Sequence, residues 1–172
     1  MKVRYAGLEV NDFLNGEGVS VSFWTQGCPH KCTGCHNPET HDFNGGIEIE
    51  YETLLEKVLN SISNNGIIRN FSILGGEPLC PQNIELVTKL IQDIKNQYPN
   101  ILIYCWTGYT FAELLLMPKV KKMLKYINVL IDGRFVLDNR DVTLKLRGST
   151  NQRVIDVQKT LEAKEIILIE DK

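Results

Sequence analysis

The stretch GVSVSFWTQGCPHKCTGCHNPET, residues 18–40, joins an alternating segment to a cluster of cysteines. In residues 18–26, valine and phenylalanine alternate with serine, and this period of two is typical of a β-strand with one buried face. Three of the five cysteines of the chain, Cys28, Cys32 and Cys35, follow within eight positions. The stretch therefore predicts a strand whose carboxyl end leads directly into a cysteine-rich loop.

Composition and charge limit the classes of protein to which the chain can belong. A chain of 172 residues that is 43% hydrophobic and 23% charged fits one globular domain, so we expect residues 1–172 to form a single domain. The net charge of -2, with both signs interleaved, predicts no nucleic-acid partner, and no segment reaches the roughly 20 apolar residues of a membrane span. An odd number of cysteines argues against a disulfide scaffold, so we expect a reducing compartment, the cytoplasm.

Helical and strand patterns alternate along the rest of the chain. Periodicity predicts helices at 51–63, 81–98 and 110–117, and strands at 67–74, 101–105, 127–131 and 165–170. This alternation is typical of βα units. The chain is shorter than the roughly 250 residues of a complete eightfold barrel. We therefore predict an α/β fold, a partial, open (β/α) barrel with a mainly parallel sheet.

The spacing C-x3-C-x2-C lets three thiolates reach one metal centre from a single loop. A structural zinc site needs four ligands from cysteine and histidine, and His30 and His36 are the candidates for the fourth. An iron-sulfur cubane held by only three cysteines instead leaves one iron open to an external ligand. The missing fourth cysteine favours the cubane, with zinc or a redox dithiol as the alternative. The two remaining cysteines, Cys80 and Cys105, are predicted to be small buried hydrophobic residues.

Two motifs carry a family resemblance. The three clustered cysteines resemble the signature of the radical S-adenosylmethionine superfamily, and GGEP, residues 75–78, resembles its glycine-rich motif. Within that superfamily the chain resembles the anaerobic (class III) ribonucleotide reductase-activating proteins, at residues 15–40, 105–109, 129–135 and 147–152. Gly34 before the third cysteine is typical of that family, whereas Ser20 stands where the family often carries an arginine.

The resemblance implies a radical S-adenosylmethionine fold, a cofactor set and a reaction. A 4Fe-4S cluster would be held by Cys28, Cys32 and Cys35, and S-adenosylmethionine would bind its open iron. Reductive cleavage of the cofactor would give a 5'-deoxyadenosyl radical, which would take a hydrogen atom from a glycine of the reductase. The residues expected to bind the cofactor are Gly34, Cys35, His36, Gly75, Gly76, Glu77 and Asp132.

The resemblance also implies partners and leaves alternatives. The partners would be an anaerobic ribonucleoside-triphosphate reductase and a reduced flavodoxin or similar electron donor. The alternatives are another glycyl-radical activase, of the pyruvate formate-lyase type, or a zinc-binding interaction module without catalysis. Glu77 would either accept a hydrogen bond from the cofactor or orient its loop, Asp132 would contact the cofactor or cap a turn, and His41 is expected at the surface.

Overall fold

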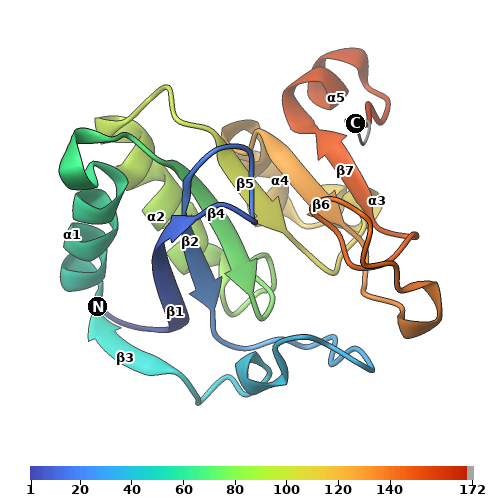
Figure 1. The fold of residues 1–172 in the computed structure, drawn as a ribbon, viewed down its shortest axis with the longest axis horizontal. Coiled ribbons are helices and arrows are strands. Elements are labelled where there is room, and N and C mark those ends of the chain that lie inside the picture. The colour runs from blue at the N-terminus through green and yellow to red at the C-terminus, as the bar shows by residue number, and fades with distance from the viewer. Residues whose placement is uncertain (170–172) are drawn as a thin grey trace.

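A computed structural model describes residues 1–169 and contains one seven-stranded sheet, in the order β3-β1-β2-β4-β5-β6-β7 (Figure 1). Its strands are β1 Lys2–Asp12, β2 Ser20–Thr25, β3 Ile47–Glu50, β4 Asn70–Gly75, β5 Ile103–Trp106, β6 Val129–Asp132 and β7 Arg153–Asp156. The α-helices are α1 Tyr51–Ile62, α2 Ile84–Gln97, α3 Phe111–Leu115, α4 Pro118–Met123 and α5 Val157–Ala163. None of the helices within residues 1–169 has the length and apolar character required to cross a membrane.

The centre of the sheet is parallel and its edges are antiparallel. Strands β2, β4, β5 and β6 run in one direction, and α2 and the α3–α4 pair connect successive members of this set. At the edges, β1 pairs antiparallel with β2 and β3, and β7 pairs antiparallel with β6. Since β3 and β7 end the strand order, the sheet does not close. The prediction of an open α/β fold with a parallel central sheet is confirmed.

The two faces of the sheet differ in chemistry. On β4, Phe71 and Ile73 belong to the main hydrophobic core, whereas Ser72 between them faces the opposite side, as the period of two requires. The same alternation on β5 sends Cys105 into the core and Trp106 to the other face. Helices α1 and α2 bury their apolar stripes in this core. The helices therefore cover one face of the central sheet, and loops cover the other.

Three strands, β1, β3 and β7, and two α-helices, α4 and α5, were not predicted. Strands β1, β3 and β7 lie at the edges, and α5 follows β7 directly. The prediction of a strand at 165–170 is wrong, because its described part forms only a single β-bridge, between Leu168 and Ile155. Residue Glu170 of that prediction lies outside the described residues.

The carboxyl ends of the four parallel strands lie at one edge of the sheet. The cysteine loop follows β2, the glycine pair spans the end of β4, Thr107 follows β5 and Gly133 follows β6. In open α/β sheets this edge is where ligands bind. The connectivity thus brings together motifs that are up to about a hundred residues apart in the sequence.

Candidate functional site

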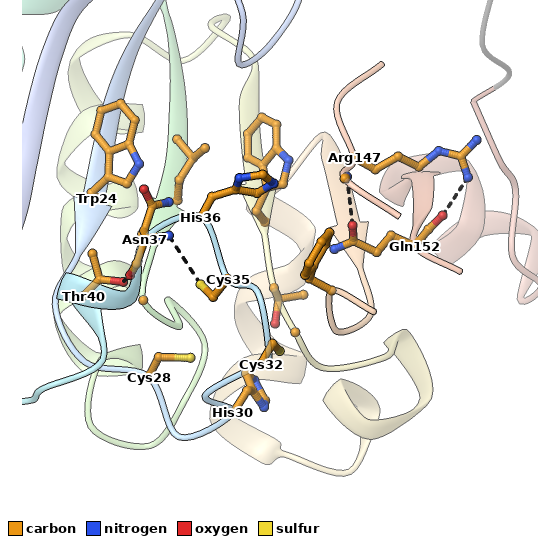
Figure 2. A pocket seen from close by; sticks show the side chains of 18 of the residues that line it. Trp24, Cys28, His30, Cys32, Cys35, His36, Asn37, Thr40, Arg147 and Gln152 are labelled. Carbon is orange, nitrogen blue, oxygen red and sulfur yellow. Dashed lines mark hydrogen bonds between the residues drawn. The ribbon is translucent and has the colours of Figure 1, made fainter. Parts of the chain in front are cut away.

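A cavity of about 520 Å³ lies at this edge, between the strand ends and the covering loops. Cys28, Cys32 and Cys35 all line it (Figure 2). Cys28 is buried, the other two are half-buried, and all three thiols are free. The backbone N–H of Asn37 points at the Cys35 sulfur from 3.4 Å. The structure therefore brings the three predicted ligands to one cavity.

Backbone hydrogen bonds hold the start of the cysteine loop. Gly27 N donates to Thr40 O at 2.7 Å, and Cys28 N donates to His41 O at 3.2 Å. The short 3-10 helix Pro38–Thr40 turns the chain so that this return segment runs beside the loop. These two bonds anchor the start of the cysteine loop to the segment that follows it.

Burial changes the acidity of two of the cysteines. Desolvation raises the pKa of the Cys28 and Cys32 thiols, while N–H groups of His30 and Lys31 act on Cys28, and that of Phe135 on Cys32, in the opposite direction. A buried thiol that also faces N–H donors becomes a thiolate readily once a cation binds it. Three such sulfurs on one cavity fit an iron-sulfur cluster. Within residues 1–169, no three cysteine, histidine or acidic residues stand close enough together to hold a single metal ion.

Gly75 and Gly76 line the cavity as predicted, and both need the absence of a side chain. Gly75 has a φ of +107°, a conformation that favours glycine. A Cβ on Gly76 would collide with the carbonyl oxygen of Gly27 and lie 2.9 Å from that of Thr40. The glycine pair therefore packs directly against the backbone that begins the cysteine loop.

Gly34 and His36 connect the cysteine loop to the segment after β6. Gly34 has a φ of +76°, and a Cβ there would lie 2.9 Å from the Leu137 side chain. The His36 ring packs on Phe135, with 5.4 Å between the ring centroids. His36 lines the cavity, whereas Gly34 supports its wall from behind. Of the two, His36 is the one placed to meet a ligand.

Glu77, predicted either to accept a hydrogen bond from the cofactor or to orient its loop, is fully buried and does not line the cavity. Its carboxylate accepts hydrogen bonds from Thr107 Oγ1 at 2.8 Å, Gly108 N at 2.6 Å and Leu79 N at 2.9 Å, and faces His30 Nε2 at 2.9 Å. All of its acceptor capacity is used inside the protein. The alternative role, orienting the loop, is the one that the structure supports.

Asp132 is likewise occupied within the fold. Its carboxylate pairs with Arg153, whose Nη2 and Nε lie 2.6 and 3.0 Å away, and accepts the N–H of Phe111 at 2.8 Å. The residue is 1% exposed and does not line the cavity. These bonds tie α3 and β7 to the end of β6 and fit the structural one of the two roles predicted for Asp132.

Sequence analysis missed several lining residues. His41, expected only at the surface, is half-buried and lines the cavity, and its Nε2 is buried with no hydrogen-bond partner in residues 1–169. Trp24 and Trp106 line it from the loop-covered face of the sheet. Arg147 and Gln152 line it on the side away from Cys28 (Figure 2). The only signal for this last pair was the resemblance of residues 147–152 to a family segment.

The five thiols are expected to react at very different rates with an alkylating reagent in the cluster-free protein. Cys32 and Cys35 are half-buried beside the cavity and should be modified first. Cys80 and Cys105 are 0% exposed, and burial raises the pKa of Cys80 to about 11, so both should react only after unfolding. Peptide mass spectrometry over a time course measures each rate, with denatured protein as the control. Fast labelling of Cys80 in the folded chain would contradict this geometry.

Comparison with known proteins agrees with the cysteine site. The family described as "4Fe-4S single cluster domain" matches residues 14–155. Relatives named anaerobic ribonucleoside-triphosphate reductase-activating protein include one from Pasteurella multocida, 34% identical over 87% of this chain and 95% of its own length. Those of Escherichia coli K12 and bacteriophage T4 are 38% and 39% identical over 83% of this chain and 92% and 87% of their own. The chain belongs to the family of anaerobic ribonucleoside-triphosphate reductase-activating proteins.

Proposed function

We propose that this chain is a radical S-adenosylmethionine enzyme that places a glycyl radical on an anaerobic ribonucleoside-triphosphate reductase. The observation that carries the proposal is the set of three free cysteines on one cavity at the carboxyl ends of parallel strands. No other cysteine of residues 1–169 lines that cavity. A cluster held by Cys28, Cys32 and Cys35 would keep one iron free for the cofactor.

The chain itself would hold and shield the bound groups. Gly75 and Gly76 would let backbone groups approach the methionine part of S-adenosylmethionine. Trp24 and Trp106 give the cavity apolar walls that exclude water. When both groups are bound, the chemistry they supply is a one-electron cleavage that leads to removal of a hydrogen atom from a glycine of the reductase. A reduced flavodoxin or similar protein would supply the electron, and the five free thiols fit a reducing cytoplasm.

The zinc alternative loses one of its two predicted histidine ligands, His30. Both ring nitrogens of His30 are engaged, one facing Glu77 and the other accepting from Arg134. A zinc ion needs an imidazole nitrogen with a free lone pair. His30 would have to give up one of these contacts to complete a tetrahedral site, which supports the iron-sulfur interpretation.

Mixing the reconstituted protein with its reductase tests the proposal. With S-adenosylmethionine and a strong reductant alone, cofactor cleavage should be slow, because no hydrogen donor is in place. Adding the anaerobic reductase of the same organism should speed formation of 5'-deoxyadenosine and produce a doublet radical signal on the reductase. That doublet should collapse when the target glycine is deuterated at Cα.

The control is a reductase whose target glycine is replaced by alanine, which should bind yet acquire no stable radical. A wild-type reductase that stays radical-free, while the chain turns over its cofactor on another molecule, would refute the proposed partner. A colourless protein that takes up zinc and no iron would refute the cluster.

A further inference from the structure

His30, the second residue after the first cysteine, uses both nitrogens of its ring. Its Nδ1 lies 3.0 Å from Arg134 Nε, and its Nε2 lies 2.9 Å from Glu77 Oε1. A guanidinium group only donates, so Nδ1 must be the acceptor. The ring proton therefore sits on Nε2 and is donated to the carboxylate. The three side chains form one directed chain of hydrogen bonds, from Arg134 at the surface to Glu77 in the interior.

The His30 ring is also fixed by packing. It lies edge-on to Tyr109, with 4.6 Å between the ring centroids, and a Cβ on Gly108 would collide with it. The His30 and Glu77 side chains are 5% and 0% exposed. The ring therefore packs between its own cysteine loop and the end of β5.

Glu77 connects the ends of β4 and β5 beside the His30 ring. It follows the glycine pair at the end of β4 and accepts from Thr107 and Gly108 after β5. The one cation in the network, Arg134, is separated from the carboxylate by the His30 ring. The backbone N–H of Glu77 also donates to Gly27 O at 2.8 Å, in the residue before Cys28. A buried negative charge thus stands close to the first cysteine.

We propose that His30 and Glu77 are positioning residues: they lock the loop of Cys28 and Cys32 onto the ends of β4 and β5, and Glu77 lowers the reduction potential of the cluster. The inference rests on the proposed function, because it presumes a cluster at the three cysteines. Net charge and hydrogen bonding around a cluster set its potential. A carboxylate in a low-dielectric interior disfavours the added electron, and the cation Arg134 acts in the opposite direction.

His30→Gln and His30→Leu test the lock. A glutamine amide can donate to Glu77 through its nitrogen and accept from Arg134 through its oxygen, whereas leucine can do neither. We expect His30→Gln to keep the cluster and His30→Leu to lose it to an iron chelator roughly 10- to 100-fold faster, as for other groups that orient metal ligands. Thermal unfolding of the cluster-free variants reports on the fold separately. Equal rates of cluster loss in the two variants would overturn the lock.

Charge variants test the effect on potential. In a redox titration followed by electron paramagnetic resonance, Glu77→Gln should shift the cluster to a less negative potential and Arg134→Gln to a more negative one. Glu56→Gln, on an exposed face of α1, is the matched control and should leave the potential unchanged. Because Arg134 is exposed, its variant should fold and decides the sign even if Glu77→Gln holds no cluster.

Shifts of one sign in both variants, or none in Arg134→Gln, would overturn the charge effect. These measurements need no reductase. If the potentials shift as expected but the chain places no radical on its reductase, the proposed function is refuted and this inference stands. A wild-type chain that takes up no cluster would overturn both.

Discussion

Replacing Cys28, Cys32 or Cys35 singly by alanine is expected to abolish assembly of the 4Fe-4S cluster. Each removes one of three sulfurs on the cavity, and no other cysteine in residues 1–169 reaches that cavity to replace it. A cluster with two protein thiolates lacks the support that three provide. Iron and sulfide assays after anaerobic reconstitution, with the visible absorption of the cluster, measure the loss.

Cys80→Ala and Cys105→Ala are the matched controls and should retain the cluster. Both side chains are 0% exposed, Cys105 in the core and Cys80 with its thiol 3.2 Å from the carbonyl oxygen of Glu77. Their loss should lower stability modestly, because each leaves a small void. A Cys80→Ala protein that folds but takes up no iron would mean that the ligands have been assigned wrongly.

Gly76→Ala is expected to lower both stability and cluster occupancy. Its methyl group would overlap the carbonyl oxygen of Gly27, the residue before Cys28, so the cysteine loop has to move. Overpacking of this kind costs about 1–3 kcal/mol. In a protein of this size each kcal/mol lowers the midpoint of thermal unfolding by about 2–4 °C. Calorimetry of the cluster-free protein and iron content after reconstitution measure the two effects.

Gly7→Ala, in β1, separates this collision from a general effect of losing a glycine. A Cβ at Gly7 would meet only the Trp24 ring, at 3.9 Å, which is ordinary contact. The Gly7→Ala protein should keep its cluster and its stability within about 1 kcal/mol. If Gly76→Ala behaves like Gly7→Ala, the close packing of the glycine pair on the cysteine loop is refuted.

The centre of the fold could be predicted because its signals are local. Helices α1 and α2 carry apolar residues at helical spacing, and β2 and β4 alternate or run apolar between clear turn residues. The edge strands β3 and β7 each carry only two apolar residues, in IEIE and RVID, whereas the equally short β5 and β6 lie in the longer apolar-rich segments 101–105 and 127–131. The strand predicted at 165–170 forms only a single bridge in its described part, because pairing there depends on a neighbouring strand, β7, that its own residues do not reveal.

In the candidate site, too, local features could be predicted from the sequence and tertiary contacts could not. Cys28, Cys32 and Cys35 lie within one loop, so their spacing alone predicts a shared cavity. The partners of the acidic residues cannot be found from spacing, because Glu77 bonds to His30, 47 positions away, and Asp132 bonds to Arg153, 21 positions away. A carboxylate at a strand end looks the same in sequence whether it faces a ligand or an arginine. Tertiary pairing, which only the structure reveals, decides between them.

The wall opposite Cys28 comes from residues that a ribosome adds late. The cysteine loop is complete by residue 35, but Phe135, Arg147 and Gln152 line the same cavity, and Trp106 Nε1 holds that late segment through Leu146 O at 2.6 Å. Contacts so distant along the chain form only after most of it has been synthesised. During synthesis, the three thiols are therefore exposed before the residues that complete the cavity have been added. The enclosed cavity therefore requires the chain through Gln152, and a short peptide around the cysteines would lack the wall that Phe135, Arg147 and Gln152 provide.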